Sequence, residues 1–359
     1  MADSKQAPLD SAAAAKAAFA SVQDKPFPNN IFTAPELRWA VIGCGVIANQ
    51  MAQSLALAGR KLAGVANRTL SKAQAFAEQY GVEKVYDTVE DLYADPDIDA
   101  VYITTPHNTH ITYLRAALAA GKHVLCEKAI TLNSAELEEA RAIAAEHNVV
   151  LMDATTVLHM PLYQELRRRM DAGEFGRMNL AQLNFGSYKE YGDLTNRFYN
   201  RNLAGGAMLD IGVYALSVMR LFMASQPVEV VSLGYTCKTG VDVAGGIVCR
   251  NAEQQLGVVS LTLHSKQPKR SVISFDKCYI EVNEYPRADH ATIVWTADGR
   301  REEVHAGTEA YALCYEMADL EQAVAGDDSK RELLDYASDV MELMTKLRAD
   351  WGVVYPEEE

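Results

Sequence analysis

The 359-residue sequence is poor in positive charge and has no paired cysteines. It contains 34 lysine and arginine residues against 48 aspartate and glutamate residues, which gives a formal net charge of −14. This imbalance argues against a nucleic acid or an anionic membrane as the main partner. The six cysteines form no CxxC pair and lie mostly in apolar runs. We therefore expect buried free thiols in a reducing compartment rather than disulfides or bound metal.

Long apolar runs are absent as well. None approaches the ~20 residues of a membrane-spanning helix, which argues against a membrane partner. The first twenty residues are rich in alanine, but Asp3, Asp10 and Lys16 interrupt them, so they lack the apolar core of a signal peptide. The sequence therefore predicts a cytoplasmic protein, and its length is sufficient for two domains with full cores.

The first part of the chain is expected to consist of an arm followed by an α/β domain. Residues 1–36 are expected to form an N-terminal arm in which Asp10 or Ser11 caps a short alanine-rich helix. In residues 37–153 short apolar runs alternate with amphipathic segments, which is typical of an α/β Rossmann domain with a doubly wound parallel sheet. The expected strands are 37–42, 62–66, 85–86, 100–103, 123–126 and 149–152, and the expected helices are 48–58, 71–80, 87–94, 110–120 and 134–146, the last capped by Ser134.

Residues 154–359 have a different pattern, in which several β-rich segments follow one another. We expect an α+β domain with a large, mostly antiparallel sheet and a final helix that packs back on the first domain. The expected helices are 161–172, a glycine-led helix over 206–223, 309–325 and 332–350, and the expected strands are 178–188, 228–237, 246–249, 255–264, 270–275, 278–282 and 292–296.

The segment GCGVIA has the spacing of a dinucleotide-binding fingerprint and lies between an expected strand and an expected helix. Gly43 permits the sharp turn, Gly45 lets the backbone approach a pyrophosphate, and Ala48 lets the helix pack close to the strand. The helix start, at Val46 and Ile47, offers free N–H groups and a partial positive charge to the phosphates. The alternative is an ordinary packing joint between a strand and a helix.

The residues after the second expected strand distinguish the two nicotinamide cofactors. A site selective for NAD places Asp or Glu there to hold the ribose 2′-hydroxyl, but this chain has Asn67, Arg68 and Lys72 and no acid. Arg68 and Lys72 are four residues apart, so both can face one site, and an arginine binds a 2′-phosphate in a forked geometry. The pattern favours NADP(H) and leaves NAD open. The alternative is two ordinary solvated cations.

Three polar segments are candidates for the chemistry. TTPHNTH and CEKA follow two successive expected strands, at the edge where open α/β sheets bind ligands. In the third segment, Asp210 and Tyr214 are four residues apart on the glycine-led helix and so share a face. Taken singly, each of these residues would be an ordinary packing or surface residue. The two histidines of TTPHNTH lack a third ligand and neighbouring carboxylates, so we expect no metal site.

The chain resembles the glucose–fructose oxidoreductase / inositol dehydrogenase / MocA family over about residues 37–356, on the order and spacing of GCGVIA, TTPHNTH, CEKA and AGGAMLDIGVY. It is most similar to the dihydrodiol dehydrogenase and xylose dehydrogenase branch, because it has Tyr214 where many relatives carry histidine. Its segments 239–242 and 347–356 also resemble that branch. One departure is Ala129, where the family usually has a proline after the lysine.

The resemblance implies hydride transfer between NAD(P) and a carbinol or carbonyl carbon of a sugar, polyol or trans-dihydrodiol. It also implies that Arg68 and Lys72 bind the 2′-phosphate of NADP. For residues 154–359 it implies a domain for substrate binding and oligomerisation, whose open sheet forms a subunit interface, hence a homodimer or a dimer of dimers. Together with the fingerprint, the expected cofactor contacts are Gly43, Gly45, Val46, Ile47, Asn67, Arg68, Lys72, Thr105, Pro106, His107, Glu127 and Lys128.

The expected mechanism makes Tyr214 the proton acceptor in oxidation and the proton donor in reduction. Free tyrosine titrates near pH ~10 and is a poor base, so a neighbouring ammonium is needed to lower its pKa. Lys128 is expected to do this, and to hold the substrate hydroxyl and the nicotinamide ribose. Asp210 is expected to orient Lys128 or a substrate hydroxyl, and Arg197 to contact the substrate. If Tyr214 lies out of reach, Lys128 itself transfers the proton.

Two other functions use the same fold. A redox-neutral enzyme would hold NAD tightly, oxidise a sugar transiently and eliminate a glycosidic bond, and it would retain its cofactor through purification. A non-catalytic regulator would use the nucleotide-binding domain as a sensor. Loss of the Lys128 or Tyr214 residue types would favour the regulator, but both are present. Fold alone does not separate these functions.

Overall fold

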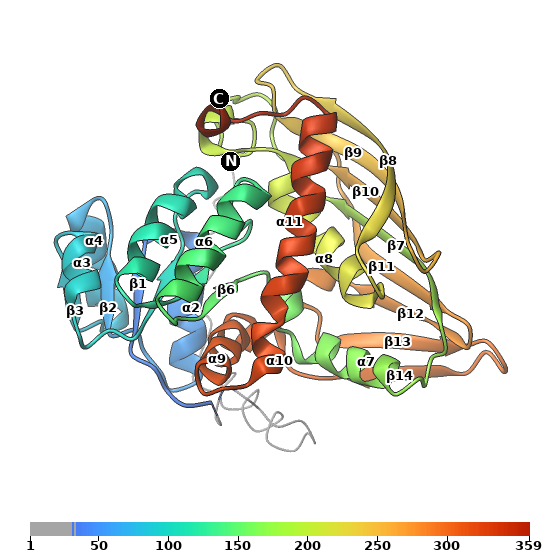
Figure 1. Ribbon diagram of the computed structural model, residues 1–359, viewed down its shortest axis with the longest axis horizontal. Coiled ribbons are helices and arrows are strands. Elements are labelled where there is room, and N and C mark those ends of the chain that lie inside the picture. The colour runs from blue at the N-terminus through green and yellow to red at the C-terminus, as the bar shows by residue number, and fades with distance from the viewer. Residues whose placement is uncertain (1–30, 32–33) are drawn as a thin grey trace, which may run out of the picture.

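The computed structural model describes residue 31 and residues 34–359 (Figure 1). The helix expected after Asp10 or Ser11 lies outside the described residues. The described chain forms two parts, one built on a parallel sheet and one built on a larger, mostly antiparallel sheet.

The first part is a six-stranded parallel sheet with the strand order β3-β2-β1-β4-β5-β6. The direction of winding reverses between β1 and β4, which is where doubly wound sheets bind ligands. Every residue of β1 and β4 is buried, because helices cover both faces of a parallel sheet. The predicted fold class is confirmed. The strands are β1 (Trp39–Ile42), β2 (Gly64–Ala66), β3 (Lys84–Tyr86), β4 (Ala100–Ile103), β5 (His123–Cys126) and β6 (Leu151–Asp153), and the helices are α2 (Val46–Leu57), α3 (Leu70–Tyr80), α4 (Val89–Ala94), α5 (His110–Ala119) and α6 (Ser134–Glu146).

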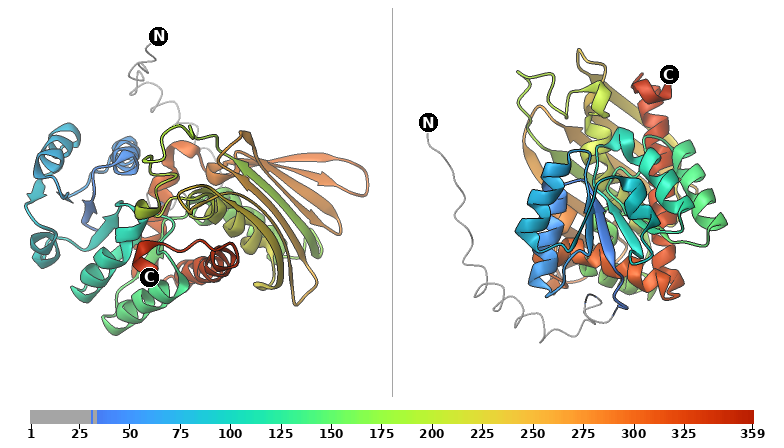
Figure 2. Two further views of the ribbon diagram at one scale, coloured as in Figure 1. Left: turned by 90° about the horizontal axis from the view of Figure 1, so that it is seen from above. Right: turned by 90° about the vertical axis from the view of Figure 1, so that its left-hand side faces the viewer.

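The second part is an eight-stranded sheet with the order β14-β13-β12-β11-β7-β10-β9-β8. Only β7 and β10 are parallel neighbours, so the predicted mostly antiparallel sheet is confirmed. Among the described residues, helices pack on one face and leave the other open (Figure 2). The strands are β7 (Met178–Gly186), β8 (Pro227–Thr236), β9 (Asp242–Asn251), β10 (Leu256–Thr262), β11 (Gln267–Phe275), β12 (Cys278–Asn283), β13 (His290–Trp295) and β14 (Arg301–His305), and the helices are α7 (Pro161–Asp171), α8 (Val213–Phe222), α9 (Ala312–Val324), α10 (Asp328–Arg331) and α11 (Leu333–Asp350).

The last helices of the chain join the two parts. α9 packs on α2, and α11 lies against α6 and β6 as well as α8 (Figure 1). Glu321 of α9 accepts hydrogen bonds from the Trp39 indole at 2.9 Å and from Leu37 N at 3.2 Å, and it pairs with Arg60. This buried carboxylate is therefore neutralised by the first part of the molecule, as a buried charge requires. The buried residues of both parts form one hydrophobic core.

The glycine-led helix has an irregular start. A π-helix over Met208–Gly212 precedes α8. The buried Asp242 holds this start, because its Oδ2 accepts a hydrogen bond from Met208 N at 2.6 Å. Gly206 has a φ of +129°, and a Cβ there would collide with Asp242 Oδ1, so the close approach requires glycine. Within the part of the chain that the structure describes, Arg201–Phe222 is long and apolar enough to cross a membrane, but 83% of its apolar window is buried inside the protein.

Two local predictions are wrong. Asn133 rather than Ser134 caps α6, since its side chain accepts a hydrogen bond from Glu136 N at 3.0 Å. The edge strand β14 was not predicted, because its sequence REEVH buries only Val304 and so lacks an apolar run. The bounds of β4 and β5 match the prediction, whereas several other elements begin or end a few residues away from it.

Candidate active site

The fingerprint turn after β1 leaves open space in front of α2. Gly43 has a φ of +101°, and a Cβ there would lie 2.7 Å from Thr104 Oγ1, so only glycine fits. A Cβ on Gly45 would meet no atom within 4 Å. Val46, the first residue of α2, is 78% exposed although it is apolar. The turn therefore presents uncovered backbone that a bound cofactor would cover.

The N-terminus of α2 fits a pyrophosphate. Its N-cap, Gly45, makes no side-chain capping hydrogen bond, and its first turn contains no acid. The first N–H groups of the helix are therefore not satisfied by side chains, and they carry the positive end of the helix dipole. Ile47 packs against the core and Ala48 is fully buried, so the helix lies close to the sheet as the fingerprint requires.

Two exposed cations follow β2, where the ribose of a dinucleotide lies in this fold. The side chains of Arg68 and Lys72 make no hydrogen bond or ion pair with the described residues. Burial raises the pKa of the Cys44 thiol to about 11, and the Lys72 charge opposes that rise. Asn67 donates to a carbonyl of its own turn at 3.0 Å. Because the turn contains no acid, its residues fit a 2′-phosphate.

Lys128, directly after β5, joins the two parts of the molecule at Asp210. Its ammonium donates to the Asp210 main-chain carbonyl at 2.6 Å and lies 3.3 Å from Asp210 Oδ1. The same ammonium lies 4.8 Å from the centroid of the Tyr214 ring. The Lys128 and Asp210 side chains are only 13% and 12% exposed. The structure thus brings together the three residues that the sequence suggests for catalysis.

Lys128 and Asp210 are both charged at neutral pH. Burial lowers the pKa of Lys128, but the attraction of Tyr214 and Asp210 outweighs this effect, and the pKa is raised overall. Burial raises the pKa of Asp210, but the charges of Lys128 and Arg197 outweigh it, and the pKa is lowered overall. A lysine that remains an ammonium cannot accept a proton. Lys128 is therefore suited to stabilise negative charge and not to act as a base.

The pKa of Tyr214 differs from the expectation. Burial raises it, and the Lys128 ammonium lowers it by a smaller amount, so the pKa of Tyr214 is raised overall. The reason is geometric, since Lys128 lies over the ring and shares its charge with Asp210. The prediction that Lys128 lowers the pKa of Tyr214 below its usual range is wrong in this structure. At neutral pH the Tyr214 hydroxyl keeps its proton and is available as a donor.

His107 fixes the backbone that carries Lys128. Its Nε2 lies 3.0 Å from Lys128 O and its Nδ1 lies 3.4 Å from Ala204 O. One ring therefore contacts both the loop after β5, which carries Lys128, and the loop before the π-helix that carries Asp210. Burial, assisted by the Lys128 charge, lowers the pKa of His107 to about 3. The neutral ring has one N–H and donates to one of these carbonyls. The peptide bond between Lys128 and Ala129 is cis.

The loop after β4 is tied to the loop after β5 by His110. This fully buried ring places Nε2 2.8 Å from Thr105 O and Nδ1 3.0 Å from Ala129 O. Pro106 begins the short 3₁₀ turn that leads into α5. Thr105 and Pro106 thus lie at the same edge of the sheet as the fingerprint turn. In the described part of the chain, no group of three or more His, Cys, Asp or Glu side chains could hold a metal ion.

Glu127 accepts a hydrogen bond from the Tyr102 hydroxyl of β4. Burial raises the pKa of Glu127, while this hydrogen bond and the Lys128 charge oppose the rise. Arg287, in the turn after β12, adds a further positive charge near Glu127 and donates to Gln50 Oε1 of α2 at 3.1 Å. Sequence reasoning missed Tyr102 and Arg287, because one lies within an apolar strand and the other in an irregular turn far along the chain.

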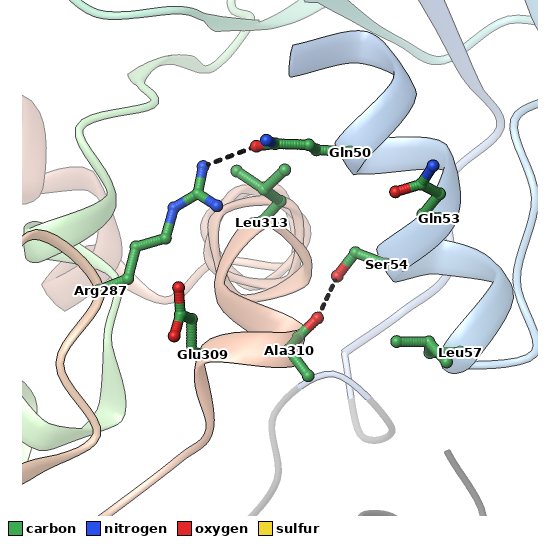
Figure 3. A pocket seen from close by; sticks show the side chains of 8 residues that line it. All are labelled: Gln50, Gln53, Ser54, Leu57, Arg287, Glu309, Ala310 and Leu313. Atoms are coloured by element: carbon green, nitrogen blue, oxygen red, sulfur yellow. Dashed lines mark hydrogen bonds between the residues drawn. The ribbon is translucent and has the colours of Figure 1, made fainter. Parts of the chain in front are cut away.

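A pocket of about 380 Å³ lies beside Arg287, between α2 and the start of α9 (Figure 3). Arg287 meets Gln50 across it, and Ser54 donates to Ala310 O at 2.8 Å further along α2. Lys128, Asp210 and Tyr214 do not line this pocket, so it belongs to the joint between the two parts of the molecule. Its lining residues are Gln50, Gln53, Ser54, Leu57, Arg287, Glu309, Ala310 and Leu313.

Arg197 reaches the site from the loop between β7 and the glycine-led helix. Its Nη2 lies 3.4 Å from Asp210 Oδ1, and its side chain is 59% exposed, so it faces both Asp210 and solvent. Arg201, a second cation of this loop, donates to Val354 O at 2.7 Å and so is directed to the C-terminal segment. Of the two arginines, Arg197 is the one placed to meet a substrate.

The fold and the site together define a class of protein, a nicotinamide-dependent oxidoreductase with a second domain built on an open sheet. A family model described as "Oxidoreductase family, NAD-binding Rossmann fold" matches residues 37–155, and the "GFO/IDH/MocA C-terminal domain" model matches residues 163–281. The chain belongs to the glucose–fructose oxidoreductase / inositol dehydrogenase / MocA family. It is an enzyme of the dehydrogenase type with a domain that binds NAD or NADP, as predicted.

Curated relatives include the trans-1,2-dihydrobenzene-1,2-diol dehydrogenases of two frogs. The Xenopus tropicalis protein is 30% identical over 251 residues, which cover 68% of this chain and 74% of the relative. The Xenopus laevis protein is 27% identical over 332 residues, which cover 89% and 99%. The predicted resemblance to the dihydrodiol dehydrogenase branch is confirmed.

Solved structures of the same fold include KijD10, a 3-ketoreductase from Actinomadura kijaniata in complex with NADP and TDP-benzene. It superposes with a TM-score of 0.74 at 25% identity, over 88% of this chain and 98% of KijD10. The aldose-aldose oxidoreductase from Caulobacter crescentus superposes with a TM-score of 0.77 over the same shares, at 21% identity. At that identity the likeness shows the fold alone.

Proposed function

We propose that the protein transfers a hydride between a nicotinamide cofactor and a carbinol or carbonyl carbon of a sugar, polyol or trans-dihydrodiol. One observation carries the proposal. Lys128, Asp210 and Tyr214 converge at the end of β5, on the edge of the sheet that also carries the fingerprint turn. The names of the relatives, which are diol dehydrogenases and a 3-ketoreductase, support this class of substrate.

When bound, the nicotinamide ring gives or takes the hydride, and the protein has to hold the substrate oxygen and move its proton. We place that oxygen between the Tyr214 hydroxyl and the Lys128 ammonium. Tyr214 donates its proton as a carbonyl is reduced and takes the proton back as a carbinol is oxidised. Lys128 stays positive and stabilises the negative charge that develops on the oxygen. Asp210 holds the ammonium in place through two contacts.

The cofactor that we propose is NADP(H). Its 2′-phosphate would meet Arg68 and Lys72, which are exposed and have no ion-pair partner among the described residues. A guanidinium binds a phosphate through two parallel hydrogen bonds, and a neighbouring ammonium adds charge. NAD(H) would retain the contacts to the fingerprint turn and lose these two, so it would bind more weakly.

Cofactor titration by intrinsic fluorescence tests the proposal on the wild type, Arg68→Ala and the control Lys277→Ala, which removes an exposed cation at the far end of the large sheet. We expect NADP(H) to bind more tightly than NAD(H) in the wild type and in the control. In Arg68→Ala its affinity should fall towards that of NAD(H). Equal or tighter NAD(H) binding in the wild type overturns the NADP assignment. A cofactor that survives purification and does not exchange would favour the redox-neutral function.

We also propose that two copies of the chain pair through the open face of the large sheet. On β8, the side chains of Val231, Leu233 and Tyr235 are 75%, 83% and 60% exposed. Val231 lies in register with Val248 of β9, which is 48% exposed, so the apolar surface continues across strands. An apolar surface of this kind marks an interaction site. We take a second copy of the chain as the occupant, because the resemblance to the family implies a subunit interface at this sheet.

The cellular location that we propose is the cytoplasm. All six cysteines are free in the structure, and five of them are buried. Thiols stay reduced in the cytoplasm, whereas secreted proteins commonly carry disulfides. Cell fractionation with an antibody against the protein tests this location, and recovery of the protein outside the cytoplasmic fraction would overturn it.

A further inference from the structure

Three cations face one carboxylate at the site, in a protein whose net charge is −14. Lys128 Nζ and Arg197 Nη2 lie 3.3 Å and 3.4 Å from the same oxygen, Asp210 Oδ1. Burial raises the pKa of Asp210. The charge of Lys189, just after β7, opposes that rise together with the charges of Lys128 and Arg197. The Lys189 ammonium makes no hydrogen bond or ion pair with the residues that the structure describes. The site therefore has more positive than negative charge.

Two of these cations lie on the same aromatic ring. The Arg197 guanidinium and the Lys189 ammonium are each 4.1 Å from the centroid of the Phe198 ring. A ring attracts cations through its quadrupole but does not cancel their charge, so the two like charges repel each other. Burial lowers the pKa of Lys189, and Asp210 only partly restores it. An anion that contacts both side chains would offset this repulsion.

One side chain connects this pair of cations to the reacting centre. Asp210 contacts both Arg197 and Lys128, and Lys128 lies over the ring of Tyr214. A group bound at Arg197 and a carbon held at Tyr214 can therefore belong to one small molecule. Because Arg197 is 59% exposed and uses one contact for Asp210, its remaining donors are free to bind a carboxylate or a phosphate.

We propose that the substrate carries an anionic group, a carboxylate or a phosphate ester, that binds to Lys189 and Arg197 while its reacting carbon lies at Lys128 and Tyr214. This inference rests on the proposed function and specifies the substrate class as a sugar acid or sugar phosphate. A neutral sugar or diol would leave the half-buried Lys189 ammonium without a charged partner, at a cost in binding free energy.

The first test measures binding of inorganic phosphate by calorimetry to the protein saturated with NADPH, so that the cofactor's own phosphate site is filled. The variants are Lys189→Met, Arg197→Leu and the control Lys277→Met, which lies at the far end of the large sheet. We expect phosphate to bind the wild type and the control, and each site variant to bind it about tenfold or more weakly. No phosphate binding to the wild type, or equal binding to all four proteins, overturns the inference.

The second test compares kcat/KM for D-glucuronate and D-glucose 6-phosphate with that for D-glucose and D-xylose. We expect at least one anionic sugar to be preferred, and this preference to be lost in Lys189→Met and Arg197→Leu and kept in the control Lys277→Met. A preference for the uronate identifies a carboxylate, and a preference for the phosphate ester identifies a phosphate. If the wild type prefers neutral sugars, the inference of an anionic substrate is wrong but the proposed function is not affected. Failure to bind NADPH or to turn over any sugar overturns the proposed function instead.

Discussion

Lys128 and Asp210 face each other across the joint between the two parts of the molecule, with 2.6 Å between the ammonium and the Asp210 carbonyl oxygen. Lys128 follows a strand of the parallel sheet, and Asp210 lies in the π-helix that precedes α8. The site is therefore complete only when both parts are packed together. A small displacement of either part would move the ammonium away from the Tyr214 ring and from the place we assign to the substrate oxygen.

Replacing Lys128 with methionine removes the charge that faces Tyr214 and keeps a side chain of similar length. We expect kcat to fall by roughly 10²–10⁴, because the charge on the substrate oxygen then develops without a cation beside it. Cofactor affinity should fall much less, since the fingerprint turn and the cations after β2 are unchanged. Stopped-flow turnover and fluorescence titration measure the two effects separately.

The variant Lys128→Arg is the matched control for charge. It retains the positive charge, so it should recover part of the kcat that Lys128→Met loses. Both variants should have a thermal unfolding midpoint near that of the wild type, which shows that a change in kcat is not caused by unfolding. If Lys128→Met turns over within a factor of about ten of the wild type, Lys128 does not stabilise the reacting oxygen and the proposed mechanism is wrong.

The pH dependence of Tyr214→Phe tests the proton carrier. Because burial raises the pKa of Tyr214, its hydroxyl is protonated through the neutral range. Wild-type reduction should therefore be constant near neutral pH and fall only at alkaline pH, whereas oxidation should rise towards alkaline pH. Phenylalanine removes the hydroxyl and keeps the ring beside Phe185, whose centroid lies 6.1 Å away. Both alkaline limbs should disappear, and kcat should fall by roughly 10²–10⁴.

Lys128 and His107 predict no limb of the pH profile in the neutral range. The pKa of Lys128 is raised, and the pKa of His107 is lowered to about 3, so both keep their charge state around neutral pH. An alkaline limb of kcat that survives in Tyr214→Phe would therefore assign proton transfer to a residue other than Tyr214, whereas loss of the Lys189 charge would act on kcat/KM. Steady-state profiles of kcat and kcat/KM in both directions provide this measurement.

The sequence predicts the parallel sheet well, because burial on both faces gives its central strands nearly continuous apolar runs. β4 and β5 have the predicted bounds for this reason. The sequence does not predict β14, because an exposed edge strand needs no apolar run and only Val304 is buried in it. The π-helix at Met208–Gly212 also has no sequence pattern of its own. It depends on the contact between Asp242 and Met208 N, which are far apart in the chain.

The candidate site was predictable where its residues stand in short motifs, as Lys128 and Tyr214 do. Lys189 and Arg287 stand in no such motif, and they reach the site only through the fold. Electrostatics was the least predictable property. A lysine beside a tyrosine suggests a lowered tyrosine pKa, but the balance between that charge and burial depends on how deeply both lie.

Asp242 gives the protein a specific dependence of stability on pH. Burial raises its pKa to about 6, while the hydrogen bond from Met208 N opposes that rise. Its pKa in the unfolded chain is near ~4. The folded state thus binds a proton more tightly, so the stability from this group is full below about pH 4 and is lost as pH rises through about 6.

The variant Asp242→Asn isolates this effect, because all other titrating groups cancel in the comparison. The free energy of unfolding of the wild type minus that of the variant should fall by up to about 3 kcal/mol between pH ~4 and pH ~7. Urea denaturation at a series of pH values measures it. Glu146→Gln, an exposed change on α6, should give a constant difference. A constant difference for Asp242→Asn as well would show that its carboxyl is not perturbed by burial.

A charge on the open face of the large sheet should separate the proposed dimer. Leu233 is 83% exposed in one chain, so glutamate there costs the monomer little, but it would bury an unpaired charge between two copies. Light scattering after size exclusion should give twice the chain mass for the wild type and one chain mass for Leu233→Glu. Gln79→Glu, on the exposed side of α3, adds the same charge elsewhere and should leave the dimer intact. A wild type that elutes as a monomer, or a Leu233→Glu variant that stays dimeric, would exclude this face as the subunit interface. Because the acid–base residues all lie within one chain, kcat of the separated monomer should stay close to that of the dimer.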